Sequence, residues 1–263
     1  MNDSPKIWRK KLACLNQERA KEFLSGSDIR PKLDSAFLNR LTTRCAEIFV
    51  KLNPAVHTSI AQSDISVFVA SQIQATTQKL KKAGLLPKLN NHGRRSECMA
   101  FNWLRGYATL MFFMPAIESM FSVRREDITF AGKDHELDAN SFKKSPLADI
   151  TIRKGQRVEV QAGFQGKNDI KEHKIVQALE QSKHDQTTTI LLHFDIFNGR
   201  AAVIDISNLG NNNPNYIQRA GMEGKAVMEI PDAWFNWDLT MPIPPNILSL
   251  TNQNLPRLGN PPE

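Results

Sequence analysis

This 263-residue sequence has few cysteines, no long apolar run and none of the common short catalytic signatures. A membrane-spanning helix needs about 20 consecutive apolar residues. The longest apolar stretch, residues 107–117, is too short for that and contains Pro115. Residues 1–11 mix Asp3 with lysines and an arginine, so they lack the apolar segment of a secretory signal. We therefore expect a cytoplasmic protein that does not enter a membrane.

The cysteines and histidines give no sign of a disulfide framework or a zinc site. The cysteines are odd in number, widely spaced and without histidine at metal-ligand spacing, so we expect reduced thiols: Cys14, Cys45 and Cys98. The sequence contains no P-loop, no G-x-S-x-G nucleophile motif and no dinucleotide-binding fingerprint. These absences exclude the commonest nucleotide-binding and serine-hydrolase signatures.

The charge balance favours a polyanionic partner. Lysine and arginine number 34 against 27 acidic residues, which gives a net charge of +7 and a pI near 9.4. When a basic protein binds a nucleic acid, counterions are released from the phosphate backbone. A positively charged protein such as this one is therefore favoured as a nucleic-acid binder. Hydrophobic residues make up 41% of the sequence, enough for a well-buried core.

The chain divides by pattern into three parts. Residues 1–92 show apolar positions at helical spacing and predict a helical N-terminal region. A polar, turn-rich stretch at 87–93 marks a joint, and residues 93–245 form the expected core domain, which starts with a long helix over 94–121. Residues 246–263 are rich in proline and asparagine and predict an extended or disordered tail.

After Phe121 the apolar pattern changes from helical to alternating. A strand–turn–strand unit is expected around Gly155, and another around Asn198 and Gly199. In order, the expected elements are strands at 127–131, 148–153 and 157–164, a helix at 168–183, and strands at 188–197 and 200–206. This order predicts an α/β fold with a mixed central sheet flanked by helices.

Two carboxylates lie in these expected strands. Burying a carboxylate there would cost free energy unless a positively charged partner lay beside it. Asp149 opens one expected strand and Glu159 lies inside the next, across the turn near Gly155. Strand geometry allows both carboxylates to project from the same face of such a hairpin. With the main-chain carbonyl of Val160 they would form an oxygen site of the kind that Mg²⁺ prefers.

The alternation along the second strand supports a shared site. Val158 and Val160 point to one side, so Glu159 and Gln161 share the other. The competing interpretation is a pair of solvated acids on an edge hairpin, paired with Arg153 and Arg157.

These residues carry a resemblance to a known family. The segment P-L-A-D, ending at Asp149, followed by V-E-V-Q with Glu159 and Gln161, resembles the active-site signature of the PD-(D/E)XK nuclease superfamily. The expected element order over the central part of the chain is also similar to that family's core. The resemblance implies a restriction-endonuclease-like fold and a type II restriction endonuclease. Such an enzyme is a homodimer that uses Mg²⁺ to hydrolyse specific double-stranded DNA and leaves 5′-phosphates.

The sequence departs from the family pattern at the usual lysine, which is Gln161 here. Three alternatives stay open. Gln161 orients the attacking water by hydrogen bonding, as in members that resemble this E-x-Q pattern. A lysine reaches in from the next helix, with Lys167 and Lys171 as candidates. Or the chain is a catalytically inactive, DNA-binding member of the fold.

The resemblance also assigns roles outside the hairpin. Glu97, early on the helix before the sheet, matches the position of an outer metal ligand; its alternative role is to complement the helix dipole. Arg94, Arg95 and Lys171 are candidate DNA contacts, although such arginine pairs are commonly just solvated. Two rival functions remain open besides the inactive member: a repair or transposition nuclease on the same core, and a protein-interaction domain with a basic surface.

Overall fold

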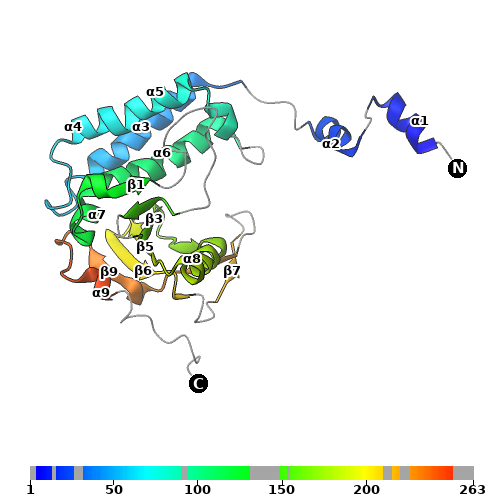
Figure 1. Ribbon diagram of the computed structural model, residues 1–263. Helices are drawn as coiled ribbons and strands as arrows, with labels where there is room; N and C mark the ends of the chain where they lie inside the picture. The colour runs from blue at the N-terminus through cyan, green and yellow to red at the C-terminus, as the bar shows by residue number, and fades with distance from the viewer. Residues whose placement is uncertain are drawn as a thin grey trace.

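The protein is an α/β structure in three layers, seen in a computed structural model (Figure 1). A layer of helices covers one face of the main sheet, and a helix with a small second sheet covers the other. No helix of the described part is long and apolar enough to cross a membrane. The structure describes residues 4–13, 16–26, 32–89, 94–130, 148–152, 155–209, 215–219 and 226–250.

The central sheet has six strands in the order β1-β2-β3-β5-β6-β9. All neighbouring pairs are antiparallel except β3 and β5, which run parallel. The sheet is therefore mixed, as the sequence predicts. Its strands are β1 (Ile128–Phe130), β2 (Ile150–Ile152), β3 (Arg157–Gly163), β5 (Thr189–Asp195), β6 (Arg200–Asp205) and β9 (Phe235–Asp238).

The helical layer begins with two capped helices. The Asp34 side chain accepts a hydrogen bond from the Phe37 N–H, and Asp64 accepts from Ser66 and Val67, so each carboxylate satisfies otherwise unpaired amides. The layer comprises α3 (Ser35–Leu52), α4 (Ile65–Phe68), the π-helix η1 (Val69–Gln74), α5 (Ala75–Lys82), the 3₁₀ turn η2 (Leu86–Leu89), α6 (Ser96–Phe112) and α7 (Met114–Phe121).

The largest core joins this helical layer to the sheet. Phe49 of α3, Phe112 of α6 and Phe194 of β5 are all fully or almost fully buried in one cluster. The expected helix over 94–121 is divided at Phe113, whose ring stacks on Phe194 with centroids 3.8 Å apart. Pro115 lies in the first turn of α7, where proline fits because its missing N–H has no helical partner. The predicted N-terminal region thus shares a core with the sheet.

The opposite face is covered by α8 (Glu172–Asp185) and a three-stranded sheet in the order β4-β8-β7. Alternate residues of β5 serve the two faces, since Leu192 packs in the first core and Leu191 in the second. The short strands are β4 (Asp169–Lys171), β7 (Ile217–Gln218) and β8 (Ala226–Glu229). The 3₁₀ turns η3 (Arg125–Asp127) and η6 (Asp232–Trp234) directly precede β1 and β9.

One predicted element starts differently. The expected helix over 168–183 begins as β4, which pairs with β8, and α8 starts only at Glu172. Neither candidate lysine therefore reaches in from the helix as expected, and Lys167 is an exposed loop residue before β4. Lys171 ends β4 and occupies the position just before α8.

The two ends of the chain hold short helices, α1 (Ser4–Lys11), α2 (Gln17–Ser25) and α9 (Ile247–Leu250). Ile247 is buried in the main core, so the expected tail of 246–263 begins with a packed helical turn. The rest of that tail, 251–263, lies outside the described residues, as do residues 90–93 of the expected joint.

Candidate metal and phosphodiester site

The β2–β3 hairpin brings Asp149 beside Glu159. Ile150 pairs with Val158, so continuing the antiparallel register by one residue places the two acids opposite each other. The Asp149 carboxylate accepts a hydrogen bond from the Val160 N–H at 2.7 Å, which fixes it at the edge of β3. In an extended strand the N–H and C=O of one residue point to the same edge. The Val160 carbonyl is therefore directed to the edge where Asp149 lies.

Glu159 is a buried carboxylate on the face of the sheet covered by α8. Its residue is 5% exposed, and its Oε2 lies 2.9 Å from the Lys174 Nζ. Burial raises the pKa of Glu159, while Lys174, Lys171 and a hydrogen bond from Gln161 act in the opposite direction. The buried Glu159 carboxylate therefore depends on nearby positive charge to remain ionised.

This burial contradicts the alternative of two solvated acids. Arg157, offered as a partner in that alternative, instead forms an ion pair with Asp185 at the end of α8. Arg153 lies outside the described residues. Val158 and Val160 do pack toward the helical layer, so the predicted alternation along β3 is confirmed.

A small hollow adjoins the Glu159–Lys174 pair. Its volume is about 10 Å³, near the minimum that holds one water molecule. Thr189 contributes a buried Oγ1 that has no hydrogen-bond partner among the described residues. A species the size of a water molecule, bound in the hollow, would give the Thr189 hydroxyl a partner. The hollow is lined by Ala148, Glu159, Lys174, Gln177, Ala178, Gln181, Thr189 and Ile206.

The lysine that contacts Glu159 is Lys174, which the sequence analysis did not name. Lys174 lies in the first turn of α8 and reaches Glu159 across 15 positions of sequence. The charge of Lys171 lowers the pKa of Glu159, and Lys167 is exposed in the loop before β4. Lys174 is the next lysine after Lys167 and Lys171 in the sequence. Its orientation toward Glu159 depends on where α8 begins, which the sequence pattern did not predict.

Glu97 has a set of partners of its own at the start of α6. Its Oε1 accepts hydrogen bonds from the Asp34 N–H at 2.6 Å and from Arg95 at 3.0 Å. The Arg95 hydrogen bond is the largest cause that lowers the pKa of Glu97, to about 2. These contacts tie α3 to α6, and they give the predicted role as an outer metal ligand no support.

The two arginines before α6 differ in their surroundings. Arg95 is engaged by Glu97 and lies over the Phe37 ring, 4.7 Å from its centroid. Arg94 is exposed on the surface. Their predicted contacts with DNA stay predictions.

The described residues hold no cluster of three or more histidine, cysteine or acidic side chains suited to a metal ion. The predicted set differs from such a cluster, because it consists of two carboxylates and a main-chain carbonyl. Asp149, Glu159 and Val160 are adjacent, and this donor set is all oxygen, so it fits Mg²⁺ in kind.

A second buried polar network lies at the far end of β3 and β5. The His193 Nε2 is 2.8 Å from the Asn168 Oδ1, and Asn168 donates to Asp195, which also pairs with Arg200. Burial lowers the pKa of His193 to about 4, although Asp195 and Asp169 oppose this. The neutral imidazole and its partners fix the loop between β3 and β4.

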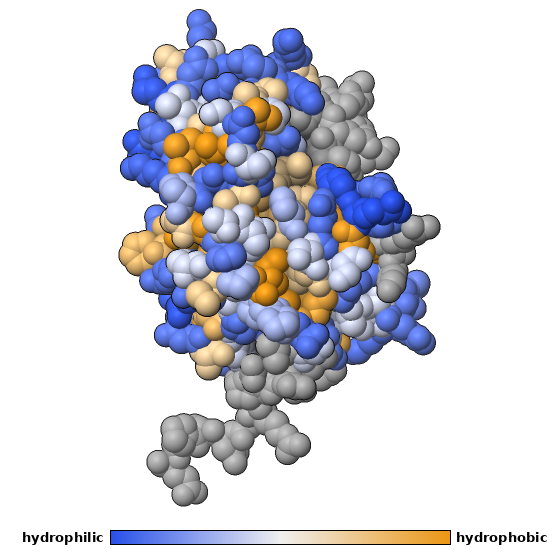
Figure 2. All heavy atoms as spheres, turned by 90° about the vertical axis from the view of Figure 1, so that its left-hand side faces the viewer, coloured by the Kyte–Doolittle hydropathy of each residue, from blue (hydrophilic) through white to orange (hydrophobic). Residues whose placement is uncertain are grey.

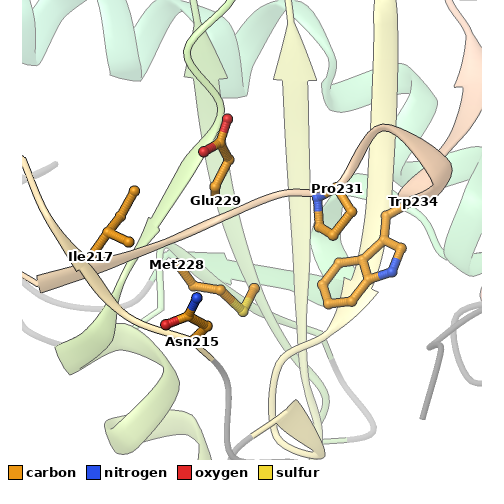
Figure 3. Close-up of a pocket in the computed structure, with 6 residues that line it drawn as sticks. All are labelled: Asn215, Ile217, Met228, Glu229, Pro231 and Trp234. Atoms are coloured by element: carbon orange, nitrogen blue, oxygen red, sulfur yellow. The ribbon is translucent and has the colours of Figure 1, made fainter. Parts of the chain in front are cut away.

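A separate apolar pocket of about 210 Å³ lies beside the small sheet (Figure 3). Figure 3 shows the indole ring of Trp234 on one side and the side chains of Met228 and Asn215 on the other. Trp234 and Trp237 are both buried, as expected for core residues. The pocket and the Glu159 hollow share no lining residue.

No protein-family model, curated protein or solved structure matches the chain. The functional assignment therefore depends on the geometry of the hairpin and on the motif resemblance.

Proposed function

We propose that the protein is a Mg²⁺-dependent endonuclease of double-stranded DNA with a restriction-endonuclease-like core. The observation that carries the proposal is the pairing of Asp149 with Glu159 across the β2–β3 hairpin, with Lys174 in contact with Glu159. The net charge of +7 fits a polyanionic substrate. The order helix, strand, hairpin, helix, strand over 96–195, with the short strand β4 added before α8, is similar to that of the family that the motif resembles.

Three groups of the chain would hold the metal: the carboxylates of Asp149 and Glu159 and the carbonyl of Val160. A bound Mg²⁺ at such a site stabilises charge on a phosphoryl oxygen and lowers the pKa of a bound water. The hydrogen bond from the Val160 N–H orients the Asp149 carboxylate before any substrate arrives. Burial keeps water away from Glu159, which strengthens its interaction with a cation.

Lys174 supplies the positive charge that Gln161 cannot. Its ammonium lies 2.9 Å from the Glu159 Oε2, so it would hold a water or a phosphoryl oxygen next to the carboxylates. Gln161 hydrogen-bonds Glu159 from the same strand face and positions it. In this proposal Lys174 takes the place that the sequence offered to Lys167 or Lys171.

A catalytically inactive DNA-binding protein is the second candidate, and two observations favour it. Lys174 already neutralises Glu159, and the hollow beside the pair has a volume of only about 10 Å³. If the pair never opens, no metal enters. The two candidates differ in cleavage and not in DNA affinity.

The test is incubation of a long DNA of known sequence, and of supercoiled plasmid, with the full chain in Mg²⁺ or in EDTA. We expect discrete cleavage only with Mg²⁺, ends that carry 5′-phosphate, and complete loss in Glu159→Gln. The matched control is Glu180→Gln, an exposed carboxylate of α8, which should cut like the unaltered protein. Salt-sensitive binding without cleavage would support the inactive candidate, and absence of both would refute the proposal.

A further inference from the structure

The first described segment, residues 4–26 (the N-terminal arm), carries large apolar side chains that its own fold leaves uncovered. Ile7 and Trp8 of α1 are 54% and 61% exposed, and Phe23 and Leu24 of α2 are 66% and 69% exposed. No described residue of the arm belongs to any of the hydrophobic clusters. Such a concentration of exposed apolar side chains marks an interaction surface.

The arm is also strongly basic. Helix α1 carries Lys6, Arg9, Lys10 and Lys11 and has no acidic residue. Trp8 and Leu12 lie four positions apart, so they share one side of the helical turn. A partner surface for α1 should therefore combine an apolar floor with negative charge.

The helical layer has a groove of that character. It has a volume of about 290 Å³ and includes two carboxylates and no lysine or arginine. Phe68 and Met114 form a buried floor, while Val67 is 60% exposed at its side. We call it the acidic groove; its lining is Gln62, Ser63, Asp64, Val67, Phe68, Ser71, Gln72, Met111, Met114, Pro115 and Glu118.

The groove is lined by residues of α4, η1, α6 and α7, and α4 and α7 lie on the left-hand side of Figure 1. Figure 2 views this side and shows apolar patches set among hydrophilic residues. The π-helix η1 contributes Ser71 and Gln72 to the lining. Single π-helical turns occur frequently at functional sites, because the widened turn changes which side chains reach the surface.

We propose that α1 of one copy docks in the acidic groove of a second copy. Trp8 would pack against Val67, Phe68 and Met114, and the lysines of α1 would face Asp64 and Glu118. Each chain carries one arm and one groove, so reciprocal exchange closes a two-fold dimer without leaving either surface open. The charge complementarity selects this occupant, and the proposal does not depend on the proposed nuclease activity.

The first test is the mass of the full chain in solution, measured by sedimentation or light scattering across a concentration series at low salt. We expect twice the chain mass of 29.7 kDa for the unaltered protein. Val67→Arg and the pair Ile7→Ser with Trp8→Ser should each give a monomer. The matched control is Val50→Arg, an exposed helical valine outside the groove, which should stay dimeric. A monomeric unaltered protein, or dimers in all variants, would overturn the proposal.

Charge reversal tests the same contact without removing apolar surface. Glu118→Lys should weaken the dimer at least tenfold, and adding Lys10→Glu in the same chain should restore it. Circular dichroism checks that each variant keeps its helical content. Failure of the second change to rescue the first contradicts the predicted pairing of α1 with the groove.

Cross-linking separates exchange between copies from docking within one copy. Trp8→Cys and Val67→Cys are placed on separate, differently tagged chains, which are mixed and oxidised. We expect a disulfide between the two tags above the background that each variant gives with its native cysteines. A link that forms only when both cysteines are in one chain means docking within the chain and refutes exchange. If the arm contacts only DNA, removing it will change the affinity for DNA but leave the mass of the protein in solution at the same multiple of the chain mass. That result also refutes the proposed exchange.

Discussion

Lys174 and Glu159 form a buried ion pair whose two partners depend on each other. The side chains are 18% and 7% exposed, and removing one member of such a pair leaves an uncompensated charge, which costs about 3–5 kcal/mol when that charge persists. In Lys174→Met, Glu159 can avoid this cost by binding a proton, because burial already raises its pKa.

We therefore expect Lys174→Met to lower Mg²⁺-dependent cleavage by about 10²–10³-fold, the usual effect of losing one charge-stabilising group. The equivalent changes Lys167→Met and Lys171→Met should lower it much less, since the ion pair of Glu159 is formed by Lys174. The measurement is single-turnover cleavage of plasmid at saturating Mg²⁺. An equal loss of cleavage rate in the Lys167→Met variant would instead assign the role of the positive group to Lys167.

His193 makes the stability of the fold depend on pH. Burial lowers its pKa from 6.5 to about 4, so the folded state disfavours the protonated ring. The resulting stabilisation is complete above pH 6.5 and is lost as the pH falls from 6.5 toward 4, because the unfolded chain binds the proton first. Between pH 8 and pH 5 the protein should lose about 2 kcal/mol through this residue.

Denaturant unfolding at the two pH values measures that loss, and His193→Gln is the comparison. The variant should be less stable at pH 8 but should lose markedly less stability on acidification. His57 is half-buried and its ring bonds locally to Ser59, so His57→Gln serves as the control and should keep the full pH dependence. An unchanged slope in His193→Gln would assign the effect to other groups.

At this scale the sequence predicts the acids well and their partners poorly. Asp149, Glu159 and Gln161 follow from alternation within one hairpin, where neighbours are close in sequence. The Lys174 contact depends on the helix starting at Glu172, and the hydrogen bond of Glu97 with the Asp34 N–H spans 63 positions. Long-range contacts of this kind leave no local pattern.

The end of strand β3 depends on a glycine that packs against the buried polar network. A Cβ at Gly163 would lie 2.5 Å from the Asn168 Oδ1 and 3.3 Å from the His193 Nε2. We expect Gly163→Ala to destabilise the fold by about 1–3 kcal/mol, because the added methyl displaces a hydrogen-bonded pair. Thermal unfolding measures the effect.

Gly106 is the matched control for that substitution. It lies on α6 and a Cβ there would meet nothing within 4 Å. Alanine is more favourable than glycine in the interior of a helix, so Gly106→Ala should stabilise the protein by about 0.5–1 kcal/mol. Effects of the same sign at both positions would contradict the packing described for β3.

Many elements up to residue 206 are predictable from periodicity, whereas the strands of the small sheet and β9 are not. The helices of residues 35–82, the β2–β3 hairpin and the β5–β6 hairpin each contain their own signal, through caps, alternation and the turn at Gly199. Strand β4 was missed because its partner β8 lies some sixty positions away and its Ile170 also fits a helical pattern. The break at Phe113 has a local signal in the sequence, because Pro115 lacks the N–H that a continuous helix would need.

For the whole molecule, the shared core argues that residues 32–250 unfold together. Phe49, Phe112 and Phe194 belong to one buried cluster although they come from the predicted N-terminal region and the predicted core domain. We expect a single unfolding transition, and a fragment of residues 93–245 should fail to fold because it exposes that cluster. Two resolved transitions in calorimetry would instead support a boundary at 92.

Deleting residues 1–26 is the corresponding control at this scale. No described residue of that segment joins a hydrophobic cluster. The shortened chain should therefore unfold at low protein concentration with a midpoint within a few degrees of the full chain, whereas removal of 1–92 should abolish cooperative unfolding.

The strand order β1-β2-β3-β5-β6-β9 has a consequence for biosynthesis. Except for β4, β7 and β8, which form the small sheet, each strand joins the edge left by the one before it. A nascent chain leaving the ribosome can thus extend the sheet in the direction of translation, without reopening an edge already paired. Asp149 and Glu159 would come together early, when β2 pairs with β3. Helix α8, which carries Lys174, would emerge before β5 pairs in parallel with β3.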